Sequence, residues 1–340
     1  MKGVVFLGEC KCEVQEFPDP VPGPSQVRVK MMATGICGSD MRAYPVSTEQ
    51  AKERGSRIPG HEPCGIADLV GSRVKTIREG DRVTVYHYLG CGHCADCAAG
   101  DLMWCSQTKA YGAHMHGSHA EYIIADARNC VPLPDAISFI DGAFTACPGG
   151  TAYCSVQKLE VKAGDSMAIF GLGPVGLSAV LLAKAKGCRV VGVDIVEDRV
   201  TLARQVGADA AVNAQRDDPV EAIRDFAGGA GATAALEASG SFEARENMIA
   251  CLGRRGRGVL VGTGSSEKCL DPNQLKSKQL TLMGSFVLPL WMTWEMVDFL
   301  EKQKLSFENA VTHRFPMDKA EEAYATFAEG KSGKVILESP

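Results

Sequence analysis

The chain has 340 residues, of which 45% are hydrophobic, so it is long enough for two domains with separate cores. Its formal net charge is −5 and no strongly basic segment occurs, which argues against nucleic acid as a partner. The opening segment, MKGVVFLGECKCEVQEF, fits neither a signal peptide nor a membrane span, and fourteen cysteines without an export signal indicate a reducing compartment. We therefore expect a cytoplasmic protein with no membrane partner.

Short β-branched segments between turn residues characterise the chain up to about residue 147. Examples are VRVK at 27–30, RVTVY at 82–86 and AEYII at 120–124. Short strands of this kind, separated by glycine and proline, predict an irregular, mostly β domain.

Four cysteines follow within this domain, at Cys91, Cys94, Cys97 and Cys105, with the spacing C-x2-C-x2-C-x7-C. Four thiolates in one compact loop predict a tetrahedral structural zinc site in a lobe over about 88–108. Two-residue gaps are too short for a relaxed pair of disulfides. An iron centre, or a cage without metal, are the alternatives.

The pattern changes at about residue 148 to apolar strands that alternate with helices. The expected strands are 166–173, 189–195, 210–214, 232–239, 256–262 and 280–286, and the expected helices are 174–187, 196–208, 219–229 and 242–253. This alternation predicts an α/β domain with a doubly wound parallel sheet over 148–286. The tail, 287–340, is too short for its own domain, and we expect it to pack back onto the first domain.

A glycine motif joins the first strand of this sheet to its first helix: Gly171-x-Gly173-x-x-Gly176. The first glycine permits a tight turn, the second lets the backbone approach a pyrophosphate, and the third permits close helix packing. The helix then begins at Pro174 and Val175, where unpaired amides and the helix dipole favour phosphates. The motif in this context predicts a dinucleotide site of the Rossmann type.

Asp194 ends the second strand of the sheet, 23 residues after Gly171. A carboxylate at this position accepts hydrogen bonds from ribose hydroxyls and repels a 2′-phosphate, so it predicts NAD rather than NADP. The alternative is a turn that binds no ligand, followed by an ordinary surface aspartate.

Cys37, His61 and Cys147 lie outside the four-cysteine loop, far apart in the sequence. Spacing alone does not identify them as ligands, because free cysteines are often small buried residues and a single histidine is often structural.

Eight segments in order resemble one family: ICGSD, GHE, GDRV, the four-cysteine loop, AEY, TACPGGTAY, GLGPVGL and VDI. They make the chain similar to the zinc-dependent medium-chain alcohol and polyol dehydrogenases over nearly its whole length. The resemblance implies a mostly β, GroES-like catalytic domain formed by 1–147 and 287–340, with a Rossmann NAD-binding domain at 148–286.

The resemblance also implies a second zinc, bound by the cysteine of GxCGxD, the histidine of GHE and a third ligand before the cofactor domain. These positions are Cys37, His61 and Cys147. Some branches of the family have an acidic residue in the region of the third ligand, and Cys154 is a less suitable alternative because it falls inside a predicted helix. The matching positions imply that Glu62 approaches the metal during ligand exchange and that Asp40 orients the histidine.

Three further roles follow from the same resemblance. Ser39 matches the hydroxyl that takes the proton from the substrate alcohol, Arg199 matches a basic residue at the adenosine ribose, and Thr151 matches a threonine near the nicotinamide. Met41 and Arg42 depart from the family, since many relatives have a relay histidine in this region.

The function implied is hydride transfer between a CH–OH group and NAD, with zinc polarising the substrate oxygen and two zinc ions per subunit. The substrate class stays open among simple alcohols, polyols, sugars and cyclitols, and a homodimer or homotetramer is expected. The alternatives are an NADH-dependent aldehyde or ketone reductase and a non-catalytic nucleotide-binding scaffold.

Two further segments, one rich in histidine and one with two tryptophans, belong to none of the motifs above. His114, His116 and His119 lie within six residues of one another. We expect solvated or hydrogen-bonded loop histidines here rather than a metal site, and Tyr111 or His114 is a candidate for the pocket lining. Trp291 and Trp294 are expected in the core or in a subunit interface.

Overall fold

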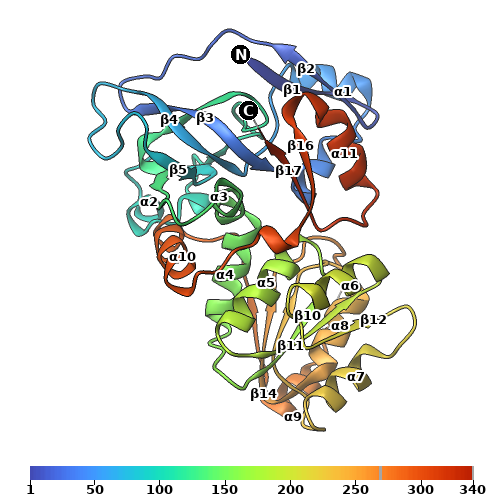
Figure 1. Cartoon of the computed structure of the whole chain (residues 1–340). Helices are drawn as coiled ribbons and strands as arrows, with labels where there is room; N and C mark the ends of the chain where they lie inside the picture. The colour runs from blue at the N-terminus through green and yellow to red at the C-terminus, as the bar shows by residue number, and fades with distance from the viewer. Residues whose placement is uncertain (268–269, 339–340) are drawn as a thin grey trace. The chain divides into compact units, whose positions relative to one another are not determined.

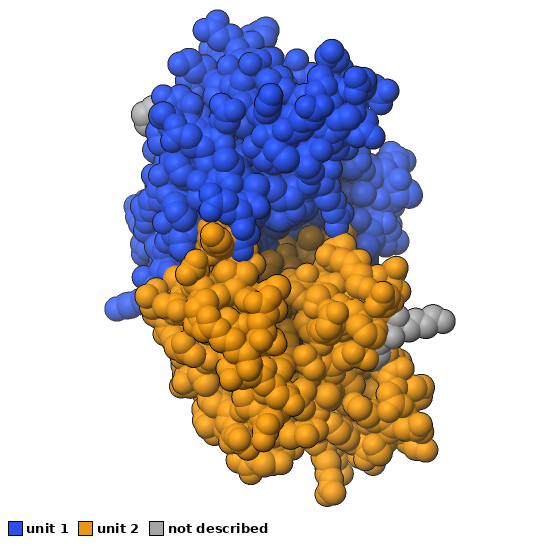
Figure 2. All heavy atoms as spheres, turned by 90° about the vertical axis from the view of Figure 1, so that its right-hand side faces the viewer, with its two compact units in different colours: residues 1–150, 289–330, 334–340 blue, residues 151–288, 331–333 orange. Residues whose placement is uncertain are grey.

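The computed structural model describes residues 1–267 and 270–338, which divide into two compact units (Figures 1 and 2). Unit 1 contains residues 1–150, 289–330 and 334–340, and unit 2 contains residues 151–288 and 331–333. The expected boundaries, 147 and 287, lie within three residues of these, and the tail from residue 289 onward belongs to unit 1 except for 331–333. No helix of the described residues is long and apolar enough to cross a membrane.

Unit 1 is built on a mixed sheet with the strand order β16-β17-β3-β4-β5-β9, and β8 pairs with β3. The strands are β3 (Gln26–Gly35), β4 (Pro63–Val70), β5 (Arg82–Val85), β8 (Tyr122–Asp126), β9 (Cys130–Pro132), β16 (Val311–Pro316) and β17 (Lys334–Glu338). Alternation along β3 buries Val27, Val29 and Met31 in a common apolar cluster. The two longest partners, β3 and β4, are antiparallel, and β17 is antiparallel to β3 on its other side.

The helices of unit 1 include α3 (Phe139–Ala146), which contacts β3, β4 and β5, and α11 (Ala320–Ala328), which contacts β17. Ser138 caps α3 by accepting a hydrogen bond from the Asp141 amide. The remaining elements of this unit are β1 (Lys2–Gly8), β2 (Lys11–Glu16), η1 (Gly38–Arg42), α1 (Thr48–Arg54), η3 (Ala127–Asn129), α10 (Leu290–Gln303), η4 (Glu308–Ala310) and η5 (Met317–Lys319). The helix α4 (Pro148–Lys158) begins in unit 1 and continues into unit 2.

The predicted zinc lobe is a small protrusion of unit 1 with little regular structure. Its elements are β6 (Tyr88–Leu89), α2 (Ala95–Ala99), η2 (Leu102–Trp104) and β7 (Lys109–Ala110). The antiparallel pairing of β6 with β7 joins the two ends of the lobe.

Unit 2 has a parallel sheet with the strand order β12-β11-β10-β13-β14-β15. The strands are β10 (Ser166–Phe170), β11 (Arg189–Asp194), β12 (Ala210–Asn213), β13 (Ala232–Glu237), β14 (Leu252–Leu260) and β15 (Thr281–Gly284). The helices are α5 (Pro174–Ala185), α6 (Glu197–Gln205), α7 (Pro219–Phe226), α8 (Phe242–Cys251) and α9 (Pro272–Lys278). The order places β10 beside both β11 and β13, which is the doubly wound arrangement of dinucleotide-binding domains.

The structure sharpens two sequence expectations. Trp291 and Trp294 on α10 are about half exposed, so neither is a core residue of unit 1, and a subunit interface stays the prediction for them. The first domain also contains the helix α3, which the sequence pattern did not predict, because the segment has only 8 residues and is buried from Ile140 to Ala146.

Candidate zinc and nucleotide sites

Strand pairing brings the separate ligand candidates of unit 1 together. Thr34 pairs with Pro63, so the end of β3 lies beside the start of β4. Cys37 therefore follows β3 at the point where His61 precedes β4. Cys147 ends α3, which packs over the same strands.

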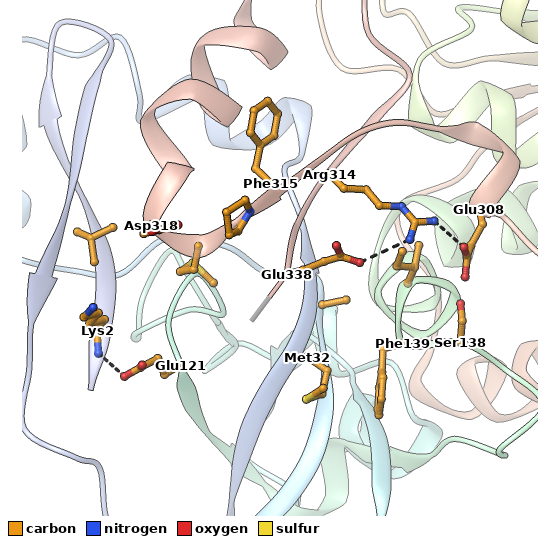
Figure 3. Close-up of a pocket in the computed structure, with 15 residues that line it drawn as sticks. Lys2, Met32, Glu121, Ser138, Phe139, Glu308, Arg314, Phe315, Asp318 and Glu338 are labelled. Carbon is orange, nitrogen blue, oxygen red and sulfur yellow. Dashed lines mark hydrogen bonds and ion pairs between the residues drawn. The ribbon is translucent and has the colours of Figure 1, made fainter. Parts of the chain in front are cut away.

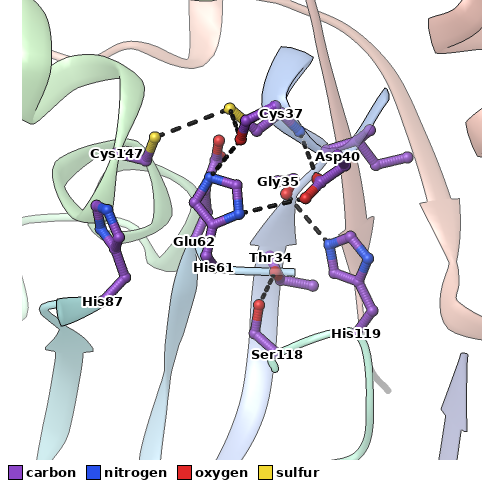
Figure 4. Close-up of polar contacts among 12 residues, drawn as sticks. Thr34, Gly35, Cys37, Asp40, His61, Glu62, His87, Ser118, His119 and Cys147 are labelled. Carbon is purple, nitrogen blue, oxygen red and sulfur yellow. Dashed lines mark hydrogen bonds and ion pairs between the residues drawn. The ribbon is translucent and has the colours of Figure 1, made fainter. Parts of the chain in front are cut away.

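The result is a mixed cluster, defined as Cys37, His61, Glu62 and Cys147, whose donor atoms all lie within 4.8 Å of one another (Figure 4). The Sγ atoms of Cys37 and Cys147 are 3.9 Å apart. This distance is too long for a disulfide and matches the separation of about 3.8 Å for two sulfurs on one tetrahedral zinc.

Asp40 and Ser39 contact this cluster from η1. Asp40 Oδ2 accepts a hydrogen bond from the Cys37 amide at 2.9 Å, and Asp40 Oδ1 lies 3.3 Å from His61 Nδ1. The carboxylate thereby directs His61 Nε2 toward the cysteines. The exposed Ser39 hydroxyl lies 3.3 Å from both His61 Nε2 and Cys37 Sγ, so it stands at the solvent side of the cluster.

The charges of the cluster suit a bound cation. A hydrogen bond with Cys147 lowers the pKa of Cys37 well below its usual value, which favours the thiolate. Burial disfavours the charged form of His61, but the nearby Asp40 and Cys37 outweigh burial and hold the pKa of His61 well above its usual value. Burial raises the pKa of Glu62 to about 7. Glu62 Oε1 is buried without a hydrogen-bond partner among the described residues, as expected for a group that awaits a ligand, whereas Oε2 lies beside the ammonium of Lys334.

The four-cysteine cluster, Cys91, Cys94, Cys97 and Cys105, is equally compact, with its four donor atoms within 4.8 Å of one another. Cys91 Sγ and Cys97 Sγ are 3.9 Å apart. Cys105 Sγ accepts hydrogen bonds from the amides of Cys91 and Gln107, at 3.3 and 3.4 Å, which stabilise a thiolate. These sulfurs fit a structural zinc site with all four positions occupied.

The glycine motif of unit 2 has the local geometry that each glycine was expected to provide. Gly171 has a φ of +85°, which favours glycine. A Cβ at position 176 would lie 1.8 Å from the carbonyl oxygen of Gly171, whereas a Cβ at position 173 would meet no atom within 4 Å. Gly173 precedes α5, with Pro174 at the first helical position and Val175 next to it.

Asp194 lies at the carboxyl end of β11, beside this loop. Its Oδ2 accepts a hydrogen bond from the Leu172 amide at 2.6 Å, and its Oδ1 accepts from the amides of Ile195 and Val196. Arg199 is paired with this carboxylate: its Nη1 lies 4.0 Å from Asp194 Oδ2, and its Nε donates to the Ser332 carbonyl. The aspartate thus holds the loop in place, a role that the sequence did not predict. Thr151, in α4, is buried and its carbonyl accepts from the Ser155 hydroxyl.

Sequence reasoning missed two residues beside the mixed cluster. The buried His87 has its ring centroid 5.3 Å from that of His61, and its Nδ1 donates to the Ala146 carbonyl at 2.6 Å. Burial lowers the pKa of His87 to about 3, so this imidazole is neutral. Lys334 forms an ion pair with Glu62 at 2.5 Å. Neither residue belongs to a motif, and only the pairing of distant strands identifies them.

The three histidines at positions 114, 116 and 119 contact different parts of unit 1 and do not form a common site. His114 Nδ1 accepts from the Ala110 amide, His116 Nδ1 accepts from the Ile58 amide, and His119 contacts the Gly35 carbonyl and the Tyr324 hydroxyl. Tyr111 is buried and its hydroxyl accepts from the Asp126 amide. We therefore assign His114 and Tyr111 to loop structure rather than to a pocket lining.

A cavity of about 720 Å³ in unit 1 lies apart from both clusters, since none of its lining residues belongs to them (Figure 3). Several of its polar groups are paired with one another: Arg314 contacts Glu308 at 2.6 Å and Glu338 at 3.7 Å, and the Lys2 amide donates to Glu121. We do not assign this cavity to the reaction.

Comparison with known proteins then identifies the family. A sequence model described as zinc-binding dehydrogenase matches residues 174–302, and a model described as alcohol dehydrogenase GroES-like domain matches residues 23–135. The zinc-type alcohol dehydrogenase-like protein YphC of Escherichia coli (strain K12) is 37% identical over 351 residues, covering 100% of this chain and 99% of that protein. This chain belongs to the zinc-dependent medium-chain dehydrogenase family.

Other relatives of this dehydrogenase have names that differ in substrate. The L-threonine 3-dehydrogenase of Pyrococcus furiosus is 36% identical and covers 97% of this chain, with 95% of its own length matched. Among solved structures, an alcohol dehydrogenase from Thermus sp. ATN1 has a TM-score of 0.91 at 26% identity, with 100% of both chains covered. Galactitol-1-phosphate dehydrogenase from Escherichia coli has a TM-score of 0.87 at 28% identity, covering 99% of this chain and 100% of that chain. A zinc-binding dehydrogenase from Sinorhizobium meliloti 1021, bound to NADP, has a TM-score of 0.89 at 28% identity, covering 99% and 98%.

Family membership confirms the α/β fold with a GroES-like domain and a Rossmann domain, and it makes the protein a zinc-dependent oxidoreductase with a nicotinamide cofactor. A non-catalytic scaffold, the alternative from another functional class, has no support in these matches.

Proposed function

We propose that this dehydrogenase binds two zinc ions per chain and exchanges a hydride between the CH–OH carbon of an alcohol or polyol and NAD. The observation that carries the proposal is the mixed cluster, with two cysteines, one histidine and one buried carboxylate whose donor atoms lie within 4.8 Å of one another. When bound there, zinc supplies a Lewis acid for the oxygen of a hydroxyl or carbonyl substrate.

The residues of this chain divide the remaining tasks. Cys37, His61 and Cys147 would hold the metal, and Asp40 fixes the orientation of the histidine. The Ser39 hydroxyl, 3.3 Å from His61 Nε2 on the solvent side, is placed to accept a proton from a substrate hydroxyl and pass it to water. Arg42 cannot act as a base in this relay because a guanidinium stays protonated.

The four-cysteine cluster would hold the second zinc. All four of its ligands are protein thiols, so no position is left for a substrate, and its role is structural.

We propose NAD as the preferred cofactor because Asp194 brings a carboxylate to the end of β11. Arg199 is already within 4.0 Å of this carboxylate, so it offers little net attraction to a 2′-phosphate. We expect Asp194→Asn, which removes the charge and keeps one of the two acceptor oxygens, to lower the ratio of kcat/KM for NAD to that for NADP by about tenfold, equivalent to about 1.4 kcal/mol. Steady-state kinetics with both cofactors measure the ratio.

Asp209→Asn is the matched control for this substitution. Asp209 precedes β12 at the amino end of the sheet, away from the nucleotide end, and it pairs with Lys184 at 2.8 Å. The cofactor ratio should be unchanged in the control. A preference for NADP in the unmodified enzyme would show that the interpretation of Asp194 is wrong.

The glycine motif gives a second pair of variants. Gly176→Ala should lower the free energy of unfolding by about 1–3 kcal/mol, because its Cβ would lie 1.8 Å from a backbone oxygen. Gly173→Ala has open space and should leave unfolding nearly unchanged, but it should weaken NADH binding about tenfold because the backbone no longer approaches the pyrophosphate closely. Denaturant unfolding and titration of NADH fluorescence separate the two effects. Equal destabilisation by both substitutions, without nucleotide, would contradict this account of the motif.

The substrate class is tested by NADH formation with primary and secondary alcohols, polyols, sugars, cyclitols and L-threonine. L-threonine is included because relatives of 36% identity carry that name. We expect turnover with at least one of these CH–OH substrates, and none in the variant Cys37→Ser. The same site serves the reverse reaction, so matched aldehydes and ketones with NADH complete the panel.

A further inference from the structure

Lys334, the first residue of β17, has its whole side chain inside unit 1 beside the mixed cluster. Its exposed fraction is 0%, as is that of Glu62, and Nζ lies 2.5 Å from Glu62 Oε2. Nζ also donates to the Ile36 carbonyl at 2.8 Å and lies 5.9 Å from the centroid of the Phe144 ring. Burying a charged pair costs free energy that an apolar pair would not, so this arrangement calls for a specific role.

The fold makes room for this pair. Ile336 pairs with Gly35, which places Lys334, two residues earlier on an antiparallel strand, next to the segment that carries Cys37. A Cβ at position 35 would lie 2.0 Å from Glu62 Oε2 and 2.3 Å from Lys334 Cε. The contact between Glu62 and Lys334 therefore requires glycine at position 35. Glycine is needed because a side chain would not fit, and not because of the backbone conformation.

The charges at the site show what the lysine does. With a metal bound, two thiolates and one carboxylate would carry three negative charges, and His61 would add a neutral nitrogen. A divalent cation balances two of these charges, and the buried ammonium of Lys334 balances the third. Without the lysine, the most direct way to neutralise the Glu62 carboxylate would be to bind the metal itself.

Four protein donors would fill a tetrahedral metal site and leave no position for a substrate oxygen. The carboxylate of Glu62 is close enough to be the fourth ligand, since one of its oxygens lies within 4.8 Å of the donor atoms of Cys37, His61 and Cys147. Oε1 has no partner, whereas Oε2 faces the ammonium.

We propose that Lys334 is a positioning residue that holds Glu62 back from the metal and so keeps the fourth coordination position open to ligands from outside the chain. The proposal deepens the proposed function and rests on it, since it requires a metal in the mixed cluster. Gly35 is needed for the same arrangement, because the absence of a side chain at this position leaves space for Glu62 and Lys334.

The test uses the cobalt-substituted enzyme and imidazole as an external ligand. The visible spectrum of Cys37→Ser, which keeps only the four-cysteine site, is subtracted from each spectrum to isolate the mixed cluster. In the unmodified enzyme, imidazole should shift this difference spectrum. In Lys334→Met we expect about tenfold weaker imidazole binding and slower loss of cobalt to a chelator, because Glu62 occupies the open position. The double variant Lys334→Met/Glu62→Gln should recover the imidazole response.

Gly35→Ala provides an independent variant, since it displaces the pair without deleting either charge, and it should change the imidazole response in the same direction. A folded Lys334→Met or Gly35→Ala enzyme that binds imidazole as the unmodified enzyme does would overturn the proposal. If the mixed cluster binds no metal, the proposed function fails, and this outcome is distinguishable. In that case the spectra of the unmodified enzyme and of Cys37→Ser would show the same cobalt bands.

Discussion

Cys37→Ser is expected to lower kcat by at least about a thousandfold, because a Lewis acid contributes several kcal/mol to such a reaction. A serine hydroxyl is a poor ligand at neutral pH, so the mixed cluster would keep only His61, Glu62 and Cys147. Cys37 lies at the start of a short 3-10 helix and is partly exposed, so its replacement should leave the sheet of unit 1 intact. The measurements are turnover, circular dichroism and metal content.

Cys154→Ser is the control for this variant. Cys154 is buried in α4 and its sulfur accepts from the Ser285 hydroxyl at 3.7 Å, so it is not part of the cluster. We expect this variant to keep both metals and most of its turnover. Loss of one metal from Cys154→Ser, with none lost from Cys147→Ser, would instead make Cys154 the third ligand.

Cys97→Ser is expected to unfold the four-cysteine lobe. Among the described residues of this lobe, the helices α2 and η2 are only 5 and 3 residues long, and the buried residues are few, so the lobe has almost no core of its own. Structural zinc supplies about 10–16 kcal/mol of folding free energy in small zinc peptides, and one missing thiolate removes a large part of it. Amide hydrogen exchange at Cys91 and Gln107, whose amides donate to Cys105, should accelerate by at least about a thousandfold.

Cys12→Ser serves as the comparison for the lobe variant, because Cys12 is buried in a different apolar cluster of unit 1. Amide hydrogen exchange within the four-cysteine lobe should be the same in Cys12→Ser as in the unmodified protein. If the lobe of Cys97→Ser kept its protection, the assignment of a structural metal to these four cysteines would be wrong.

The sequence predicted those parts of the protein whose information is local. The strand-turn-helix around Gly171 and the compact spacing of Cys91 to Cys105 both lie within one short segment, so pattern alone places them. The strand order of unit 2 follows a general rule for alternating strands and helices, and all the expected strands occur.

The mixed cluster required the family resemblance, because its members come from three distant segments. Cys37 and His61 meet only because β3 pairs with β4 in one particular register, and Cys147 arrives with a helix that the sequence pattern did not reveal. Lys334 was missed for the same reason: a lysine at the start of an apolar strand gives no local sign that its ammonium lies beside a buried glutamate. Burial and long-range pairing, rather than residue type, decide such contacts.

The central claim is that one chain holds two zinc ions, of which one depends on Cys37 and the other on the four-cysteine loop. Native mass spectrometry of the intact protein, of Cys37→Ser and of Cys97→Ser counts the metals directly. The account predicts two zinc ions per chain in the unmodified protein and one in each variant. A single zinc in the unmodified protein, or two in Cys37→Ser, would contradict it.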